Sequence, residues 1–550
     1  MMHRFYVLFL LLIQPFSSFC QLKTHADSIS HTLSDPLLVS QDWFYGPPEN
    51  NLDRDFTLPY QQALNNKDYK AYTTTDIGFT FYSDTLSYHD YIFKNKSDMF
   101  SGKIFRGNIY PLFGGDYGSG GEYGTGGVNS SGNVHDYFGG LHTDGIIGKK
   151  ISYSANVISG ELNGPAYLDS IIKYDRVVPG MGYAYGNPKT GYSYQYWDAN
   201  LSYTLNDIFN FQLGKGKQFW GDGYRSLILS DASNSYPYFK ITANVWHIQY
   251  TNLYTIMQDV EPTSTRTKNF PIKYGAFHFL TWNASRRFNF SLFEAVIWSG
   301  NQGNSVRSFD PNYLNPVIFY RPVEFSLGSA DNELVGGTFK IKASKNGQFY
   351  GQVLIDDFEI KNTLDHNGYW TNKQGLQFGF KEFNLFNGKN VTFQTEINYV
   401  RPYTYSHSNV QQNYSNYGQP LGDPMGANFI ESNSFLSWYT HNLIIEGSLT
   451  IYHVGFDPTN GTPGQTDYGQ NIFIDYDYHV NDYGNYVGQG VSTYFGIVGL
   501  RVAYIISPKM HLKAEMGADE RFEKSGPTNL SSPYVHIGIK TSLGNLYNDF

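Results

Sequence analysis

Two segments of the chain gather aromatic, amide and charged side chains of the kinds that bind hydroxyl-rich ligands. The first runs from Gly214 to Ser230 and the second from Asn315 to Leu334, and the pair Asp356-Asp357 follows them along the chain. Aromatic faces can stack on sugar rings, while arginine, asparagine and carboxylate groups hydrogen-bond to hydroxyls. The candidate ligand-binding residues are therefore Trp220, Arg225, Tyr320, Arg321, Glu324, Asn332, Asp356 and Asp357.

The charges in these segments also have a structural interpretation. Arg321 and Glu324 stand three residues apart, and burying either charge is costly unless the two are paired. Glycines at 214, 216, 221 and 223 permit backbone conformations that other residues avoid, which favours a strand ending in a sharply turned loop that re-enters the protein. We expect residues 215–230 to lie at or inside the mouth of the fold, close to 315–335, with at least one arginine–carboxylate contact in this group.

The sequence lacks the signatures of common catalytic and metal sites. It contains no His-Glu-x-x-His element and no Gly-x-Ser-x-Gly element. Asp475, Asp477, Asn481 and Asp482 could hold calcium, but the spacing is not that of an EF-hand, and solvated acidic residues are the simpler interpretation. With a net charge of −9 and no basic stretch, the chain is not suited to nucleic acid. We expect no enzyme, cofactor, metal or nucleic-acid partner.

The first twenty residues are typical of a secretory signal peptide. Arg4 precedes an apolar run from Phe5 to Ile13, and small residues precede Gln21, which predicts cleavage near Cys20-Gln21. Lipidation of Cys20 is the alternative, against which the bulky Phe19 stands. Residues 21–71 lack any regular alternation, and we interpret them as a separate N-terminal segment.

The composition of the remainder, residues 72–550, is typical of a large all-β protein. Aromatic residues make up 17% of the 550 residues and charged residues only 16%, with 56 glycines and a mean hydropathy of −0.40. Polar and apolar residues alternate with period two in paired segments, and Asn346-Gly347 and Asn387-Gly388 join such pairs as hairpin turns do. One face of the alternation is apolar and is expected to face lipid, at Trp197, Leu201, Phe339, Ile341, Phe378, Phe380, Leu500 and Val502.

The spacing of the turns indicates a transmembrane antiparallel β-barrel of about 18 strands. Tight turns are expected near 148, 206, 284, 346, 388 and 508, and the connections between them are much longer, over 160–194, 215–238, 299–334, 401–434 and 455–490. Outer-membrane barrels have this asymmetry, with the long loops outside the cell. The Gly-rich stretch 114–132 lacks the Lys-Ser/Thr of a phosphate loop, and we expect it to be a loop that folds into or over the barrel. A lumen plugged by loops follows.

The two chemistry-bearing segments resemble those of the Wzi-like capsule-assembly outer-membrane barrels. Shared elements are Gly214 to Ser230, with its Trp-Gly-x-Gly and Ser-Leu-Ile-Leu-Ser, Asn315 to Leu334, with its Arg-Pro-x-Glu and Asp-Asn-x-Leu, and Asp356-Asp357-Phe358. The resemblance covers about residues 200–360, and the Tyr- and Asn-rich loops look closer to the RemB-like gliding-motility branch.

The resemblance implies an 18-stranded plugged barrel in the outer membrane, without catalysis, that binds or anchors surface polysaccharide. Its expected partners are outer-membrane lipid and that polysaccharide. A structural or adhesion component of a gliding-motility apparatus, with motility or adhesion proteins as partners, is the first alternative. A diffusion channel is the second, although loops folded into the lumen argue against an open pore.

Overall fold

The computed structural model describes residues 79–81, 100–102 and 104–549, except 126–129, 149, 207, 261–269, 286, 303–304, 319–330, 345, 384, 386–390, 440–441, 459–465, 508–511 and 542–548. The predicted signal peptide (1–20) and N-terminal segment (21–71) lie outside the described residues. Three candidate site residues, Tyr320, Arg321 and Glu324, lie outside them as well.

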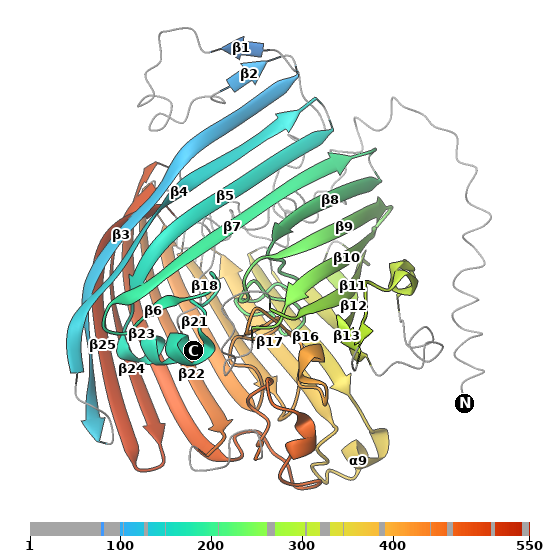
Figure 1. The fold of residues 1–550 in the computed structure, drawn as a ribbon, viewed down its shortest axis with the longest axis vertical. Helices are drawn as coiled ribbons and strands as arrows, with labels where there is room; N and C mark the ends of the chain where they lie inside the picture. Colours follow the sequence, from blue (N-terminus) through green and yellow to red (C-terminus); the bar gives the residue numbers. More distant parts are fainter. Residues whose placement is uncertain are drawn as a thin grey trace.

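The described residues form a closed antiparallel barrel of 18 strands (Figure 1). Each strand pairs with its sequence neighbour in the barrel, and the last pairs with the first along Asn529–Lys540 and Gly114–Thr125, which closes the wall. Closure leaves no unpaired strand edge, and this satisfies the backbone of every strand within the wall. The 18 strands are β3 (Phe105–Thr125), β4 (Ser130–Ile147), β5 (Ile151–Asn163), β7 (Gly191–Thr204), β8 (Phe209–Gly216), β9 (Tyr236–Val245), β10 (Ile248–Gln258), β11 (Ile272–Asn283), β12 (Phe288–Ser299), β15 (Asn332–Lys342), β16 (Gly347–Asp357), β17 (Lys373–Phe383), β18 (Val391–Val400), β21 (Phe429–Tyr439), β22 (Leu443–Phe456), β23 (Val491–Ser507), β24 (Leu512–Ser525) and β25 (Thr528–Thr541).

The remaining elements are short. Strands β1 and β2 precede β3 and pair with each other, and the others belong to the connections between barrel strands. Among the described residues, no helix is both long and apolar enough to cross a membrane. The short strands are β1 (Phe79–Phe81), β2 (Phe100–Gly102), β6 (Tyr185–Asn187), β13 (Asn301–Gln302), β14 (Ser305–Val306), β19 (Ser415–Asn416) and β20 (Gln419–Pro420). The helices are α7 (Ala166–Asp175), α9 (Ile360–Leu364) and the 3-10 turns η3 (Pro311–Leu314), η5 (Val410–Gln412) and η6 (Tyr476–Tyr478).

The alternating pattern faces the way the sequence predicts. On β7, Trp197 and Leu201 are exposed on the outside of the wall, whereas Asp198 and Ser202 are buried on the inside. Period-two alternation fixes this choice because shifting a strand by one residue would reverse every side chain on it. The other predicted outward residues are exposed or half-exposed, namely Phe339, Ile341, Phe378, Phe380, Leu500 and Val502.

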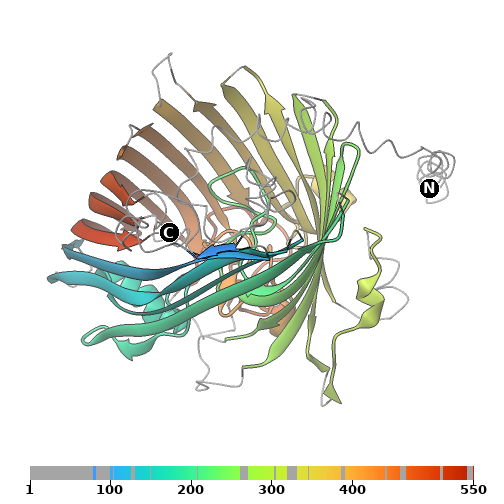
Figure 2. The same ribbon diagram turned by 90° about the horizontal axis from the view of Figure 1, so that it is seen from above.

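The connections differ between the two ends of the barrel as predicted. The strands that flank each of the six predicted tight turns are joined at one end, which we call the tight-turn end. The turn residues near 388 and 508 themselves lie outside the described residues. At the opposite end, the long-loop end, the long connections span 164–190, 217–235, 259–271, 300–331, 358–372, 401–428 and 457–490, and a two-residue turn at 526–527 joins β24 to β25. Viewed from above, several of these loops run inside the ring of strands (Figure 2).

The prediction that the Gly-rich stretch 114–132 is a loop was wrong for all of its described residues, 114–125 and 130–132, which belong to strands. Residues 114–125 are not a loop but the second half of β3, paired with β4 on one side and with β25 on the other. Hydrogen bonding on both edges of the strand outweighs the weak strand propensity of glycine. Neighbouring rings use the space that the missing side chains leave, as Phe138 does beside Gly114.

Candidate functional site

The loop between β8 and β9, residues 217–235, fills the lumen, and we call it the plug loop. Nearly all of its residues are buried, including Trp220, Arg225 and the run Leu227-Ile228-Leu229. The prediction that residues 215–230 lie at or inside the barrel mouth is therefore confirmed. Most of the 315–335 segment, to which they were expected to lie close, is outside the described residues. The neighbours of the plug loop in the lumen come from the 401–428 loop, because the Ser230 amide donates to the Leu421 carbonyl over 2.7 Å.

Apolar and aromatic side chains pack the plug loop against the wall on one side. The Trp220 indole stacks on Phe279, with ring centroids 5.1 Å apart, and meets Phe277 edge-on. From the 401–428 loop, the Tyr405 hydroxyl donates to the Leu227 carbonyl over 2.7 Å, and the Tyr414 hydroxyl donates to the Ile228 carbonyl. Burial of this apolar surface and pairing of the loop carbonyls hold the two loops together as one body.

On its other side the plug loop is bound by one inward polar side chain from each of several successive strands. Lys340 on β15 pairs with Asp222 at 2.6 Å. On β16, the Gln352 side-chain oxygen accepts from the Leu227 amide over 2.7 Å. On β17, the Gln377 amide group donates to the Arg225 carbonyl over 3.0 Å. These contacts satisfy the backbone of an irregular segment that water does not reach.

The turn at Tyr224 is held by a single carboxylate from β18. Glu396 accepts the backbone amides of Tyr224 at 2.7 Å and of Arg225 at 2.9 Å, and it also accepts the Tyr350 hydroxyl at 2.8 Å. A Cβ at Gly223 would lie 2.7 Å from Glu396 Oε2 and 2.6 Å from the Arg225 carbonyl oxygen. Gly221 adopts a φ of +153°, a conformation that favours glycine. The Trp-Gly-x-Gly element thus serves the path of the plug loop.

The Gly223→Ala variant is expected to lose about 1–3 kcal/mol of unfolding free energy, because the added methyl group overpacks the Glu396 contact. Denaturant unfolding of the full chain in detergent measures this loss. Gly132→Ala is a control with nothing within 4 Å of the added Cβ, and it should unfold as wild type does. Equal stability of the two variants would contradict the tight packing inferred for Gly223.

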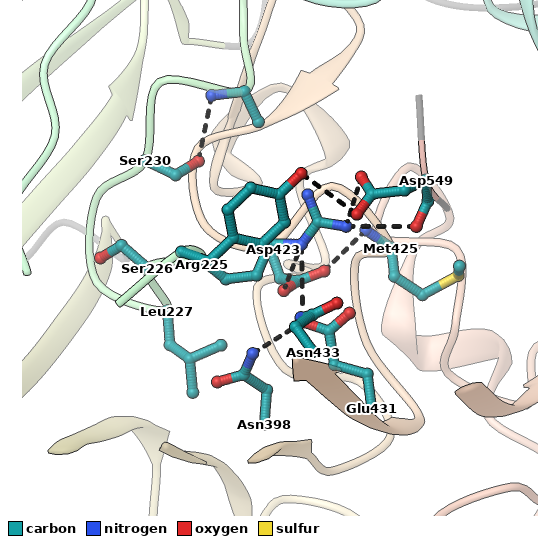
Figure 3. A network of polar contacts seen from close by, with 12 residues as sticks. Arg225, Ser226, Leu227, Ser230, Asn398, Asp423, Met425, Glu431, Asn433 and Asp549 are labelled. Carbon is teal, nitrogen blue, oxygen red and sulfur yellow. Dashed lines mark hydrogen bonds and ion pairs between the residues drawn. The ribbon is translucent and has the colours of Figure 1, made fainter. Parts of the chain in front are cut away.

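Arg225 is the centre of an ion network that joins four parts of the chain (Figure 3). Its guanidinium lies 2.9 Å from Asp549 Oδ1, 3.5 Å from Glu431 Oε1 and 4.0 Å from Asp423 Oδ2. It also donates to the Tyr452 hydroxyl over 3.1 Å. The plug loop, the 401–428 loop, strands β21 and β22, and the segment after β25 therefore meet at one cation. Arg225 does contact carboxylates, but its partners Asp423, Glu431 and Asp549 lie outside the group named from the sequence, where the contact was expected. Arg321 and Glu324 lie outside the described residues.

The charges in this network are removed from water. Arg225, Asp423 and Glu431 are essentially buried, and Asp549 is one-fifth exposed. Burial raises the pKa of Asp423, and the neighbouring Glu431 carboxylate raises it further, whereas Arg225 lowers it. Such a site is stable only while the cation stays in place.

The other described candidate residues do not take part in the ion network around Arg225. The Asn332 amide donates to the Gln412 carbonyl over 2.8 Å, deep under the 401–428 loop. Asp356 accepts the Tyr405 amide at 2.6 Å and lies 3.9 Å from Lys373. Asp357 is exposed at the long-loop end of β16.

A cluster of aromatic side chains lies at the long-loop end where the 358–372 loop meets residues 466–490. We call it the rim platform, and it comprises Tyr369, Trp370, Tyr476, His479 and Tyr483. Trp370 stacks on His479 with centroids 4.2 Å apart and contacts Tyr476 at 5.1 Å. Tyr369 and Tyr483 lie 5.1 Å apart, and Tyr483 is 56% exposed.

Backbone pairing between the two loops sets the rim platform in place. The Trp370 amide donates to the Asp482 carbonyl over 3.0 Å, and the Gly484 amide donates to the Asn367 carbonyl over 2.8 Å. The buried Lys373 ammonium lies 4.2 Å from the Tyr476 ring centroid, a distance typical of cation–π contacts. Arg401 donates to the Asn372 carbonyl over 2.7 Å. These contacts hold the rings of the rim platform in fixed positions.

Sequence reasoning missed the rim platform. The acidic residues beside it, Asp475, Asp477, Asn481 and Asp482, suggest only a calcium site when the sequence is taken alone. The aromatic residues could have been noticed from Tyr369-Trp370 following an Asn-Gly turn, but nothing local indicates that the two loops meet. Asp475 instead caps η6 by accepting the Asp477 amide over 2.8 Å.

One group in the described wall brings together three residues with metal-ligand chemistry. Asp116, Glu515 and His536 have ligand atoms within 4.8 Å of one another. The Lys540 ammonium already lies 2.8 Å from Glu515 and 3.5 Å from Asp116, so a cation of the protein occupies the position that an ion would take. We interpret the group as an ion-pair network across the β3–β25 seam.

Comparison with known proteins assigns no family to this chain. No protein-family model matches the chain, and no curated protein matches it in sequence. The resemblance to the Wzi-like family therefore stays a resemblance.

Among solved structures, the chain is similar to Wzi of Escherichia coli, described as a carbohydrate-binding β-barrel involved in group 1 capsule assembly. The identity is 14% and the TM-score is 0.47, over 78% of this chain and 85% of Wzi. It is also similar to the outer membrane protein OprD of Pseudomonas aeruginosa, at 8% identity and a TM-score of 0.40, over 80% and 96% of the two chains. OccAB2 of Acinetobacter baumannii matches at 9% identity and a TM-score of 0.43, over 78% and 97%. Likenesses at these identities concern the barrel fold alone.

Proposed function

We propose that this protein is a non-enzymatic outer-membrane barrel that binds surface polysaccharide at its long-loop end. The observation that carries the proposal is the rim platform, a set of partly exposed rings flanked by carboxylates and amides. Rings offer faces to the apolar side of a sugar, and carboxylates and amides accept or donate hydrogen bonds to hydroxyls. Of the candidates named from sequence, Asp357 is exposed at the same end, and the buried Trp220, Arg225, Asn332 and Asp356 would act by positioning the loops.

The outer wall supports a membrane location. Exposed apolar and aromatic side chains lie on the outward face of the barrel wall, for example Trp197 on β7 and Ile537 on β25. A soluble protein rarely exposes an apolar surface of this extent. Lipid is the environment that makes such a wall favourable, and cleavage of a signal peptide near Cys20-Gln21 would deliver the chain there.

The binding proposal predicts a specific loss in the Trp370→Ala variant. Polysaccharide extracted from the producing cells is immobilised, and binding of the purified full-length barrel in detergent is measured. Removing a central aromatic anchor typically costs more than 1 kcal/mol, so we expect binding weaker by about tenfold. The control is Trp246→Ala, which removes an exposed tryptophan from the turn between β9 and β10 at the opposite end. Unchanged binding by Trp370→Ala, or an equal loss in both variants, would contradict the proposal.

The two alternatives predict different results. A diffusion channel would conduct ions in a planar bilayer, whereas the plug loop and the 401–428 loop occupy the lumen and predict little conductance. A motility or adhesion component would retain a protein partner from solubilised membranes, and it would not bind extracted polysaccharide.

A further inference from the structure

The charge around the rim platform bears on which polysaccharides could bind there. Between residues 466 and 490 the chain carries four aspartates and no lysine or arginine, namely Asp467, Asp475, Asp477 and Asp482. Asp477 and Asp482 are exposed beside the rings, and the Asp482 side chain is 66% exposed. On the facing loop, Asp357, Glu359 and Asp365 are exposed as well.

The cations near the rim platform offset this charge only in part at the surface. Lys373 is 3% exposed and lies under the rings beside Asp356. Arg401 is directed at the backbone carbonyls of Tyr369 and Asn372. Burial lowers the pKa of His407 to about 4, so this imidazole is neutral at neutral pH. His479 lies 2.7 Å from Asp482, and Lys361 on α9 is the exposed cation of the 358–372 loop.

We infer that the rim platform accepts sugar chains that lack acidic groups, and rejects those that carry uronate or phosphate. The inference rests on the proposed polysaccharide binding and adds the chemical class of the ligand. Rings select for a sugar with an apolar face, which neutral and acidic sugars share. The exposed carboxylates then discriminate, because an anionic chain brought against them is repelled, whereas a neutral chain donates its hydroxyls to them.

Chemically matched glycans provide the test. Polygalacturonate and its carboxyl-reduced form have the same linkages and ring stereochemistry and differ only in charge. An array of purified bacterial polysaccharides, sorted into neutral, amino-sugar and uronate-containing classes, accompanies this pair, with the full-length barrel in detergent as the analyte. We expect neutral and amino-sugar chains to bind and the reduced polymer to bind about tenfold more tightly than polygalacturonate at low salt, with a smaller ratio at high salt.

Two variants connect the discrimination to this surface. The double variant Asp477→Asn with Asp482→Asn keeps the side-chain shapes and should bring the binding of polygalacturonate close to that of its reduced form. Glu161→Gln is the matched control, because Glu161 is an exposed carboxylate near the long-loop end of β5, and the tenfold ratio should persist in it. Heat-modifiable migration on gels verifies that each variant is a folded barrel.

The outcomes separate the inference from the proposed function. Equal or tighter binding of polygalacturonate would overturn the inference and leave polysaccharide binding intact. Discrimination that survives in the double variant would also overturn it, because the selecting charges would then lie elsewhere. Failure of every glycan on the array to bind, with folded protein, would overturn the proposed function together with the inference.

Discussion

The Arg225→Met variant is expected to lose about 3–5 kcal/mol of unfolding free energy, the cost of leaving buried carboxylates without their cation. Asp423 and Glu431 are fully buried beside Arg225, and Asp549 is mostly buried. Methionine preserves much of the volume, so lost packing contributes little. Denaturant unfolding of the full-length barrel in detergent, followed by tryptophan fluorescence, provides the measurement.

Companion variants identify the cause of this loss. Adding Glu431→Gln to Arg225→Met removes one of the stranded charges and should restore part of the stability, because neutral groups cost less to bury. Arg225→Lys keeps the charge but lacks the planar guanidinium group that reaches several partners. Its unfolding free energy should therefore lie between those of Arg225→Met and the wild type. The control is Lys189→Met, which removes an exposed cation from the turn after β6. It should unfold as the wild type does. An Arg225→Met barrel as stable as wild type would rule out the network as a source of plug stability.

The Leu500→Arg variant is expected to lose about 2–4 kcal/mol if the outer wall faces lipid, the cost of a cation near the bilayer midplane. Leu500 lies in the middle of β23, and its side chain is 55% exposed on the outside of the barrel. Unfolding from liposomes measures this cost, and unfolding from a polar polymer that replaces the bilayer should reduce it.

The matched variant places the same side chain on the inside of the neighbouring strand. Ser448 on β22 faces the lumen beside Gly499, near the carboxylate of Asp519, so the arginine of Ser448→Arg can remain hydrated or paired. Its expected cost is about 0.5 kcal/mol, as for ordinary surface substitutions. Similar losses at Leu500 and Ser448 would mean that the outer wall does not face lipid.

The barrel could be predicted from the sequence because the information that specifies it is local. Alternation along a single strand decides which face is apolar, and the turn residues between two strands decide that they pair. The tight turns near 148, 206, 284, 346, 388 and 508 and the outward placement of Trp197 or Leu500 follow from stretches of a few residues. The glycines around Trp220 likewise indicated, through backbone freedom alone, that the segment after β8 turns into the lumen.

The contacts inside the barrel and at its rim could not be predicted in the same way, because they join residues far apart in the sequence. Arg225 is paired with Asp423, Glu431 and Asp549, which lie about two to three hundred residues away along the chain, and no local spacing selects them over other carboxylates. The Gly-rich part of β3 became a strand because β4 and β25 supply hydrogen bonds to both of its edges. Trp370 and His479 stack because two loops pair across the barrel mouth. In each case the deciding interaction joins segments that come together only when the wall closes, so its free energy is absent from any local pattern.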